Sequence, residues 1–162
     1  MTYITHSVLK NPKAITTVNS SMQDTGDSKN TFLTINGSEI TYTPTSDASK
    51  VVYEISFFAK RFNDYTISVL HLEESSDGGS SWSEINEKFR KNFGHAGPSG
   101  QSHRWYLHFR YVLPAWSGEK QLRLRISPTH NTFRLELHED SYWEGGAVSD
   151  FYINTNLLMY SI

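Results

Sequence analysis

Strict alternation of apolar and polar residues in the second half of the chain is the feature that most limits the possible folds. In residues 104–113 the odd positions are all large and apolar or aromatic, and most even positions are polar. Residues 121–126 and 133–138 repeat the pattern. A period of two places the two sets on opposite faces of a β-strand. The pattern therefore predicts three strands, each with one face on a core.

The last two of these predicted strands also suggest a register. Matching their apolar faces pairs Leu124 with Leu135. The same register brings Arg125 beside Arg134, and like charges opposed across a sheet are unfavourable. We therefore predict that an anion or a partner carboxylate lies between these two arginines.

A hairpin is predicted at Asn36-Gly37, which separates two β-rich runs. This dipeptide favours a two-residue turn in which both residues have positive φ. Such a turn pairs Leu33 with Ile40 and Thr31 with Tyr42.

The middle of the chain predicts two further strands, a short helix and a loop. Residues 51–58 and 66–72 carry apolar side chains on both faces, as in central or covered strands. Ser83 is a candidate cap for a helix that ends at Arg90. Residues 92–103 follow as a long loop, a type of segment that is often functional.

Length and composition place these elements in one all-β domain. The 162 residues include no cysteine, which excludes disulfides and thiolate metal sites, and the net charge of −2 gives no broad attraction to nucleic acid or anionic membranes. No apolar run reaches the ~20 residues that a membrane helix needs. We predict an extended N-terminal arm at 1–30 and a two-sheet antiparallel β-sandwich, a jelly roll of about eight strands, at 31–162.

The final strand is unusually apolar, with four consecutive large residues from Leu157 to Tyr160. One face of such a strand meets the core, and the other needs cover as well. A second copy of the subunit is the expected cover. The predicted subunit interface contains Tyr152, Leu157, Leu158, Met159, Tyr160 and Ile162.

Residues 75–82 fit the pattern Ser-x-Asp-x-Gly-x-Ser-Trp and resemble the Asp-box hairpin of sialidase-type propellers. Asp77 can cap its own turn, Gly78 and Gly79 supply positive φ, and Trp82 can anchor the hairpin. Propellers carry one such box per blade, whereas this chain carries one in all. We interpret it as a structural hairpin without catalytic activity.

No catalytic signature or metal-ligand spacing stands out. The seven histidines are dispersed, and the carboxylates cluster on turns rather than around a cleft. Aromatic rings on loops can instead stack on sugars or anchor a protein contact, although they can equally plug one end of the sandwich. The candidate ligand or shell contacts are Trp116, Trp143, His95, His103, Arg125 and Arg134.

Three segments resemble virion structural proteins of marine tailed phages: SDGGSSWSEIN at 76–86, WYLHFR with LPAWSG at 105–118, and YINTNLLMYSI at 152–162. The layout of strands also resembles the tumour-necrosis-factor-like jelly roll, whose last strand lies near a trimer axis. These resemblances imply a homotrimer on a virus particle, either a capsid decoration protein or the receptor- or glycan-binding head of a fibre. Because no shaft precedes the domain in this sequence, decoration is the expectation.

The expected partners are further copies of the chain and the major capsid protein or another virion protein, with a host glycan as the alternative. We expect no enzymatic activity, cofactor, nucleic acid or membrane contact. The expected location is the virion, assembled in the host cytoplasm.

Overall fold

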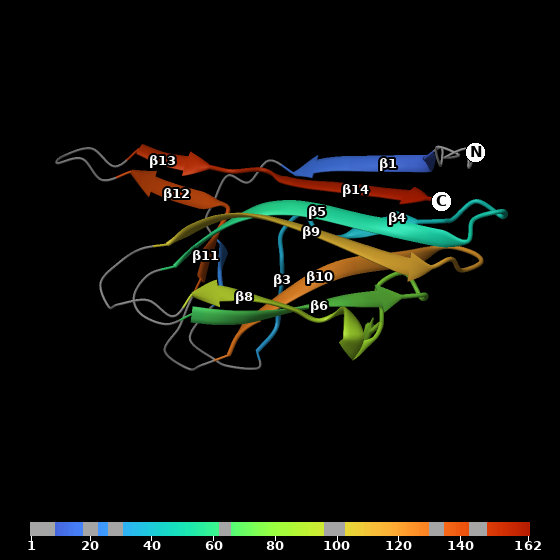
Figure 1. Cartoon of the computed structure of the whole chain (residues 1–162), viewed down its shortest axis with the longest axis horizontal. Helices are drawn as coiled ribbons and strands as arrows, with labels where there is room; N and C mark the ends of the chain where they lie inside the picture. The colour runs from blue at the N-terminus through green and yellow to red at the C-terminus, as the bar shows by residue number, and fades with distance from the viewer. Residues whose placement is uncertain are drawn as a thin grey trace, which may run out of the picture.

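The computed structural model describes residues 9–17, 23–25, 31–61, 66–95, 103–129, 135–142 and 149–162. Two antiparallel sheets pack face to face, which confirms the predicted all-β sandwich (Figure 1). The elements are β1 Lys10–Thr17, β2 Gln23–Asp24, β3 Leu33–Thr34, β4 Ile40–Tyr42, β5 Lys50–Arg61, β6 Thr66–Ser75, β7 Ser83–Glu84, the 3-10 helix η1 Glu87–Phe89, β8 Lys91–His95, β9 Arg104–Pro114, β10 Lys120–Pro128, β11 Leu135–Leu137, β12 Glu139–Tyr142, β13 Ser149–Tyr152 and β14 Thr155–Ser161.

The strand order is that of a jelly roll. In the first sheet β14 lies between β1 and β5, and β9 pairs with the opposite edge of β5. In the second sheet β10 lies between the β3/β4 edge and β6, and β8 pairs with the far edge of β6. Counting β3 and β4 as one strand gives eight principal strands, which are β1, β3/β4, β5, β6, β8, β9, β10 and β14. Numbered from one to eight in this order, they are arranged as 1–8–3–6 in the first sheet and as 2–7–4–5 in the second. This nested Greek-key arrangement brings the first and last strands together.

The core fills the space between the sheets with the residues that the alternation predicts. Tyr111 and Leu113 of β9 are buried, as are Leu122 and Leu124 of β10. Tyr53 of β5 meets Tyr111 edge to face, with ring centroids 6.1 Å apart. Burial of these large side chains is the main source of stability for the sandwich.

The first strand comes from the segment predicted to be an extended arm. β1 pairs with β14, and its register shifts between Lys10 and Lys13. Pro12 lies inside this irregular stretch, and Asn11 has a φ of 49°. A proline and a bulge are common features of an exposed edge strand, because they prevent another strand from pairing with it.

The C-terminal strand β14 is buried mainly by its own chain. Leu157 and Met159 point into the core, with exposed fractions of 2% and 0%. No second subunit is needed to bury these two side chains. Leu158 and Tyr160 lie on the other face of the sheet, where Leu158 is half-buried. The backbone of Ile162 exchanges two hydrogen bonds with Lys50.

The hairpin predicted at Asn36-Gly37 is wrong. β3 and β4 do not pair with each other; both pair with β10, in registers that differ by three residues. Asn36 and Gly37 instead form a turn closed by a hydrogen bond from the Ser38 amide to the Ile35 carbonyl. Gly37 has a φ of 79°, and a glycine at this turn position serves a type II turn as well as a hairpin.

The predicted pairing of Leu124 with Leu135 is also wrong. Leu124 pairs with Leu72 of β6, whereas Leu135 pairs with Arg61 in the other sheet. An alternating strand fits any partner whose apolar residues face the same core, so the pattern alone could not choose between them.

The helix predicted from Ser83 begins later. Ser83 lies in β7 and pairs with Glu74 of β6. The short helix η1 follows Asn86, whose side chain accepts a hydrogen bond from the Lys88 amide. Asn86 rather than Ser83 is therefore the cap.

Candidate functional site

The outer surface of the first sheet combines exposed apolar and aromatic side chains with charged ones. We call it the outward face. It contains Val52, Glu54, Phe58, Tyr106, His108, Arg110, Val112, Leu158 and Tyr160. Tyr106 and Val112 of β9 are 77% and 42% exposed. Exposed aromatic side chains beside buried apolar ones are typical of a protein–protein contact.

Charged and aromatic groups on the outward face are linked to one another. Phe58 and Tyr106 meet edge to face, with ring centroids 5.1 Å apart. Glu54 lies 3.3 Å from His108 Nε2 and 3.8 Å from Arg110 Nε. A guanidinium nitrogen of Arg110 donates to the Tyr160 hydroxyl over 3.2 Å. These contacts hold tyrosine and arginine, two residue types that often dominate binding energy, on one surface.

The outward face also contains a shallow hollow of about 230 Å³ beside β14. Ala14, Thr16, His108, Asn156 and Leu158 contribute to its lining. Tyr106 precedes His108 by one outward position on β9. A protruding ring and a hollow therefore lie close together on the same surface.

The outer surface of the second sheet carries an ionic network instead. Glu73 accepts from Arg123 over 2.7 Å and Arg125 over 3.3 Å, and it contacts His71 Nε2 at 2.9 Å. Burial lowers the pKa of His71 despite the neighbouring carboxylates. Arg125 thus faces Glu73, not Arg134, because β10 pairs with β6. The register that was expected to bring Arg134 beside Arg125 is not formed, and Arg134 itself lies outside the described residues.

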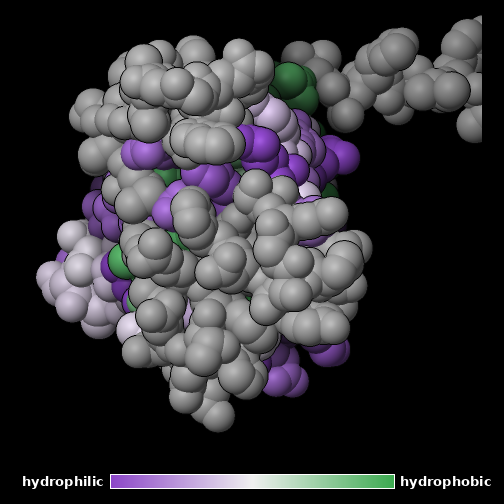
Figure 2. All heavy atoms as spheres, turned by 90° about the vertical axis from the view of Figure 1, so that its left-hand side faces the viewer, coloured by the Kyte–Doolittle hydropathy of each residue, from purple (hydrophilic) through white to green (hydrophobic). Residues whose placement is uncertain are grey.

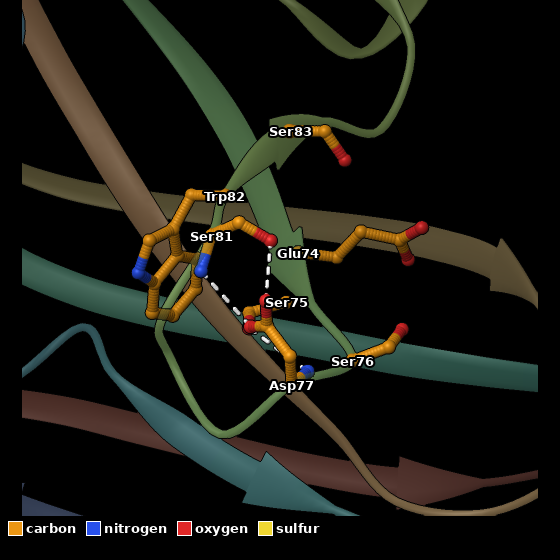
Figure 3. A pocket seen from close by; sticks show the side chains of 7 residues that line it. All are labelled: Glu74, Ser75, Ser76, Asp77, Ser81, Trp82 and Ser83. Atoms are coloured by element: carbon orange, nitrogen blue, oxygen red, sulfur yellow. Dashed lines mark hydrogen bonds between the residues drawn. The ribbon is translucent and has the colours of Figure 1, made fainter.

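The Asp-box turn has the interactions expected of a structural hairpin (Figure 3). The Asp77 carboxylate accepts from the hydroxyls of Ser75 and Ser81 over 2.6 and 2.5 Å, and these bonds hold the pKa of Asp77 well below its usual range. Trp82 Nε1 donates to the Gly79 carbonyl over 3.0 Å, and its ring stacks on Arg123. Both carboxylate oxygens of Asp77 thus accept hydrogen bonds from within the turn.

The remaining candidate contacts are distributed over the sandwich. Trp116 lies in the β9–β10 turn and borders a pocket, whereas His103 stacks on Trp105 at the start of β9, with ring centroids 6.0 Å apart. His95 ends β8, but its side chain, like that of Tyr152 in β13, lies outside the described part. Trp143 lies wholly outside it. Tyr106 was missed from the sequence, although a large aromatic residue at a predicted outward position was an available signal.

The described residues that reach the surface at the end seen in Figure 2 are mostly hydrophilic.

Among the described residues no group of three or more histidine, aspartate or glutamate side chains has an arrangement that could hold a metal ion. None of the described segments forms a helix long and apolar enough to cross a membrane.

No protein-family model matches the chain. No curated protein matches it either. Among solved structures, the chain is similar to the enzymatically active domain of tailspike protein 4 from bacteriophage CBA120, with 12% identity and a TM-score of 0.26. The similarity covers 88% of this chain and 19% of that chain. A score this low does not indicate a shared fold, and we transfer no property from it.

Proposed function

We propose that this chain is a non-enzymatic virion structural protein that forms a homotrimer through its outward face and decorates a phage capsid. The observation that carries the proposal is Tyr106, a tyrosine with 77% of its surface exposed that lies against Phe58 on an apolar sheet face. Burying this surface against another subunit removes apolar area from water at about 25 cal/mol per Å².

The two edges of the first sheet support assembly on the β9 side. The β1 edge carries Pro12 and a shifted register. β9 pairs with β5 in unbroken register and has no proline before Pro114. No described strand pairs with its second edge. An unprotected edge of this length favours association unless something covers it.

A three-fold ring joins two different surfaces of each subunit. The β9 edge and the outward face are two such surfaces, and they adjoin each other. The resemblance of three segments to phage virion proteins supports the virus particle as the location of the trimer. A structural role also agrees with an Asp-box turn whose acidic oxygens are used internally.

Sedimentation equilibrium of the 18.6 kDa chain at micromolar concentration tests the assembly. We expect three times the chain mass, and a smaller mass for Tyr106→Asp. Ile67→Asp is the matched control, since Ile67 is 48% exposed on the second sheet. A monomeric wild-type chain would overturn the trimer. Electron micrographs of particles carrying labelled protein test the location: label on the shell is expected, whereas label on the tail would contradict decoration.

A further inference from the structure

A pocket of about 210 Å³ opens beside the β9–β10 turn, away from the outward face. Leu113, Pro114 and Trp116 line it from the turn, and Ile85 lines it from the segment between β7 and η1. Glu74 of β6 and Lys120 of β10 complete the rim. The pocket thus combines an aromatic and aliphatic wall with two charged groups.

The indole of Trp116 is held in place without any ligand. Tyr42 meets it edge to face, with ring centroids 6.4 Å apart, and Lys120 Nζ lies 5.6 Å from its ring centre. A ring that is already fixed loses little conformational freedom when a ligand lies against it. The aromatic wall is therefore preorganised.

The rim offers a donor and an acceptor side by side. Lys120 Nζ donates to Glu74 Oε2 over 2.9 Å. The two side chains are 23% and 28% exposed, so both remain reachable from solvent. A hydroxyl group can accept from an ammonium and donate to a carboxylate, and vicinal hydroxyls can do both at once.

One buried donor at this pocket lacks an acceptor. Trp116 Nε1 is shielded from solvent and has no hydrogen-bond partner in the described part of the chain. An unsatisfied buried N–H is unfavourable and is rare in native proteins. Trp82, in contrast, donates its indole N–H to the Gly79 carbonyl. The indole N–H of Trp82 is thus satisfied by the turn that carries it, whereas that of Trp116 has no partner in the described part of the chain.

We propose that this pocket binds one sugar residue of a glycan. The apolar C–H face of the sugar lies against Trp116 and Ile85, and its hydroxyls contact Glu74 and Lys120. The volume is below the ~300 Å³ at which pockets for drug-sized ligands begin, which suits a single ring. A purely apolar ligand would cover the Glu74–Lys120 pair without replacing its contacts with water.

A second pocket serves as the matched comparison. It also measures about 210 Å³ and contains a lysine and a glutamate, Lys13 and Glu39, but no aromatic residue. If charge and volume were sufficient, both pockets would bind sugars alike. The proposal requires the pocket with Trp116 to bind and the comparison pocket to remain empty.

The test is titration of the ¹⁵N-labelled chain with galactose, N-acetylglucosamine, glucose and sialic acid, followed by NMR. The chain has four tryptophans, and Trp116→Phe assigns the Trp116 indole signal. We expect one sugar to shift that signal saturably as its apolar face comes to lie against the indole ring. Concentrations of about 50 mM suffice, because a site with Kd near ~1 mM is then saturated.

Two variants separate binding from folding. Lys120→Met and Glu74→Gln should each weaken the affinity about tenfold while the amide spectrum remains dispersed. Lys13→Met should leave it unchanged. The proposal is overturned if none of the four sugars shifts the Trp116 signal, or if the shift persists at the same affinity in both rim variants. Neither result bears on the trimer, which sedimentation tests separately.

Discussion

His138 and Thr155 meet inside the sandwich, with the imidazole Nδ1 3.3 Å from the threonine hydroxyl. On its other side His138 Nε2 lies 3.1 Å from Gln23 Oε1, an acceptor, which places the ring proton on Nε2. His138 is fully buried, and burial lowers its pKa to about 4. The neutral ring thus connects the segment after β11 with β14 and the β2 segment.

The first prediction concerns acid stability. The folded-state pKa of His138, about 4, lies below the unfolded value of 6.5, so the unfolded chain binds more protons between these pH values. Stability should therefore fall as pH drops through this window, by up to about 3 kcal/mol from this group. Urea unfolding at several pH values measures it.

The control for this prediction is His138→Asn, because asparagine tolerates the left-handed φ of 69° at this position and does not titrate. Burial also lowers the pKa of His71, so the wild type and the variant share that contribution. An equally steep pH dependence in both proteins would contradict the assignment to His138.

Gly37→Ala should destabilise the chain by about 2 kcal/mol or more. A Cβ at this position would lie 2.7 Å from the Cβ of Thr17 and 3.0 Å from that of Thr155, in addition to the strain of a positive φ. Gly78→Ala has a similar φ, 71°, but meets nothing within 4 Å. Thermal unfolding should show the larger loss of stability for Gly37→Ala. Equal losses in the two variants would show that the contacts with Thr17 and Thr155 add nothing to the cost.

Ser75→Ala should weaken the Asp-box turn by about 1–2 kcal/mol. The buried hydroxyl of Ser75 donates to Asp77 and accepts from the Gly79 amide over 2.9 Å, so its removal leaves both groups without this partner. The exposed neighbour Ser76, changed to alanine, is the control. Chemical denaturation in which the two variants are equally stable would show that the hydroxyl contributes nothing.

Leu158→Asp should dissociate the proposed trimer without unfolding the subunit. Leu158 is half-buried on the outward face, and an unpaired carboxylate in a subunit contact is strongly unfavourable. We expect the dissociation constant to rise at least about 30-fold, the effect of losing a residue worth ~2 kcal/mol. Ile67→Asp, at an exposed position on the second sheet, is the comparison. Circular dichroism confirms the fold, and an unchanged trimer would exclude Leu158 from the contact.

The alternation in β9 predicted the burial of Tyr111 correctly, because side-chain direction in a strand depends only on position along it. The same reasoning could not predict that Lys120 meets Glu74. These residues are 46 positions apart and become neighbours only when β10 pairs with β6. Trp116 could be selected as a turn aromatic, but its fixed orientation depends on Tyr42, which a distant strand supplies.

Local chemistry along the chain determined the alternating strands β9 and β10, their inward faces and the Asp-box turn, because neighbouring residues set each of these. The pairing partners were decided by the tertiary structure. Leu124 could pair with Leu135 or with Leu72, because both are leucines that face the core. Asn36-Gly37 could join two strands that pair with each other or two strands that both pair with β10. Only the packing of two complete sheets, which buries the most apolar surface in one arrangement, distinguishes these alternatives.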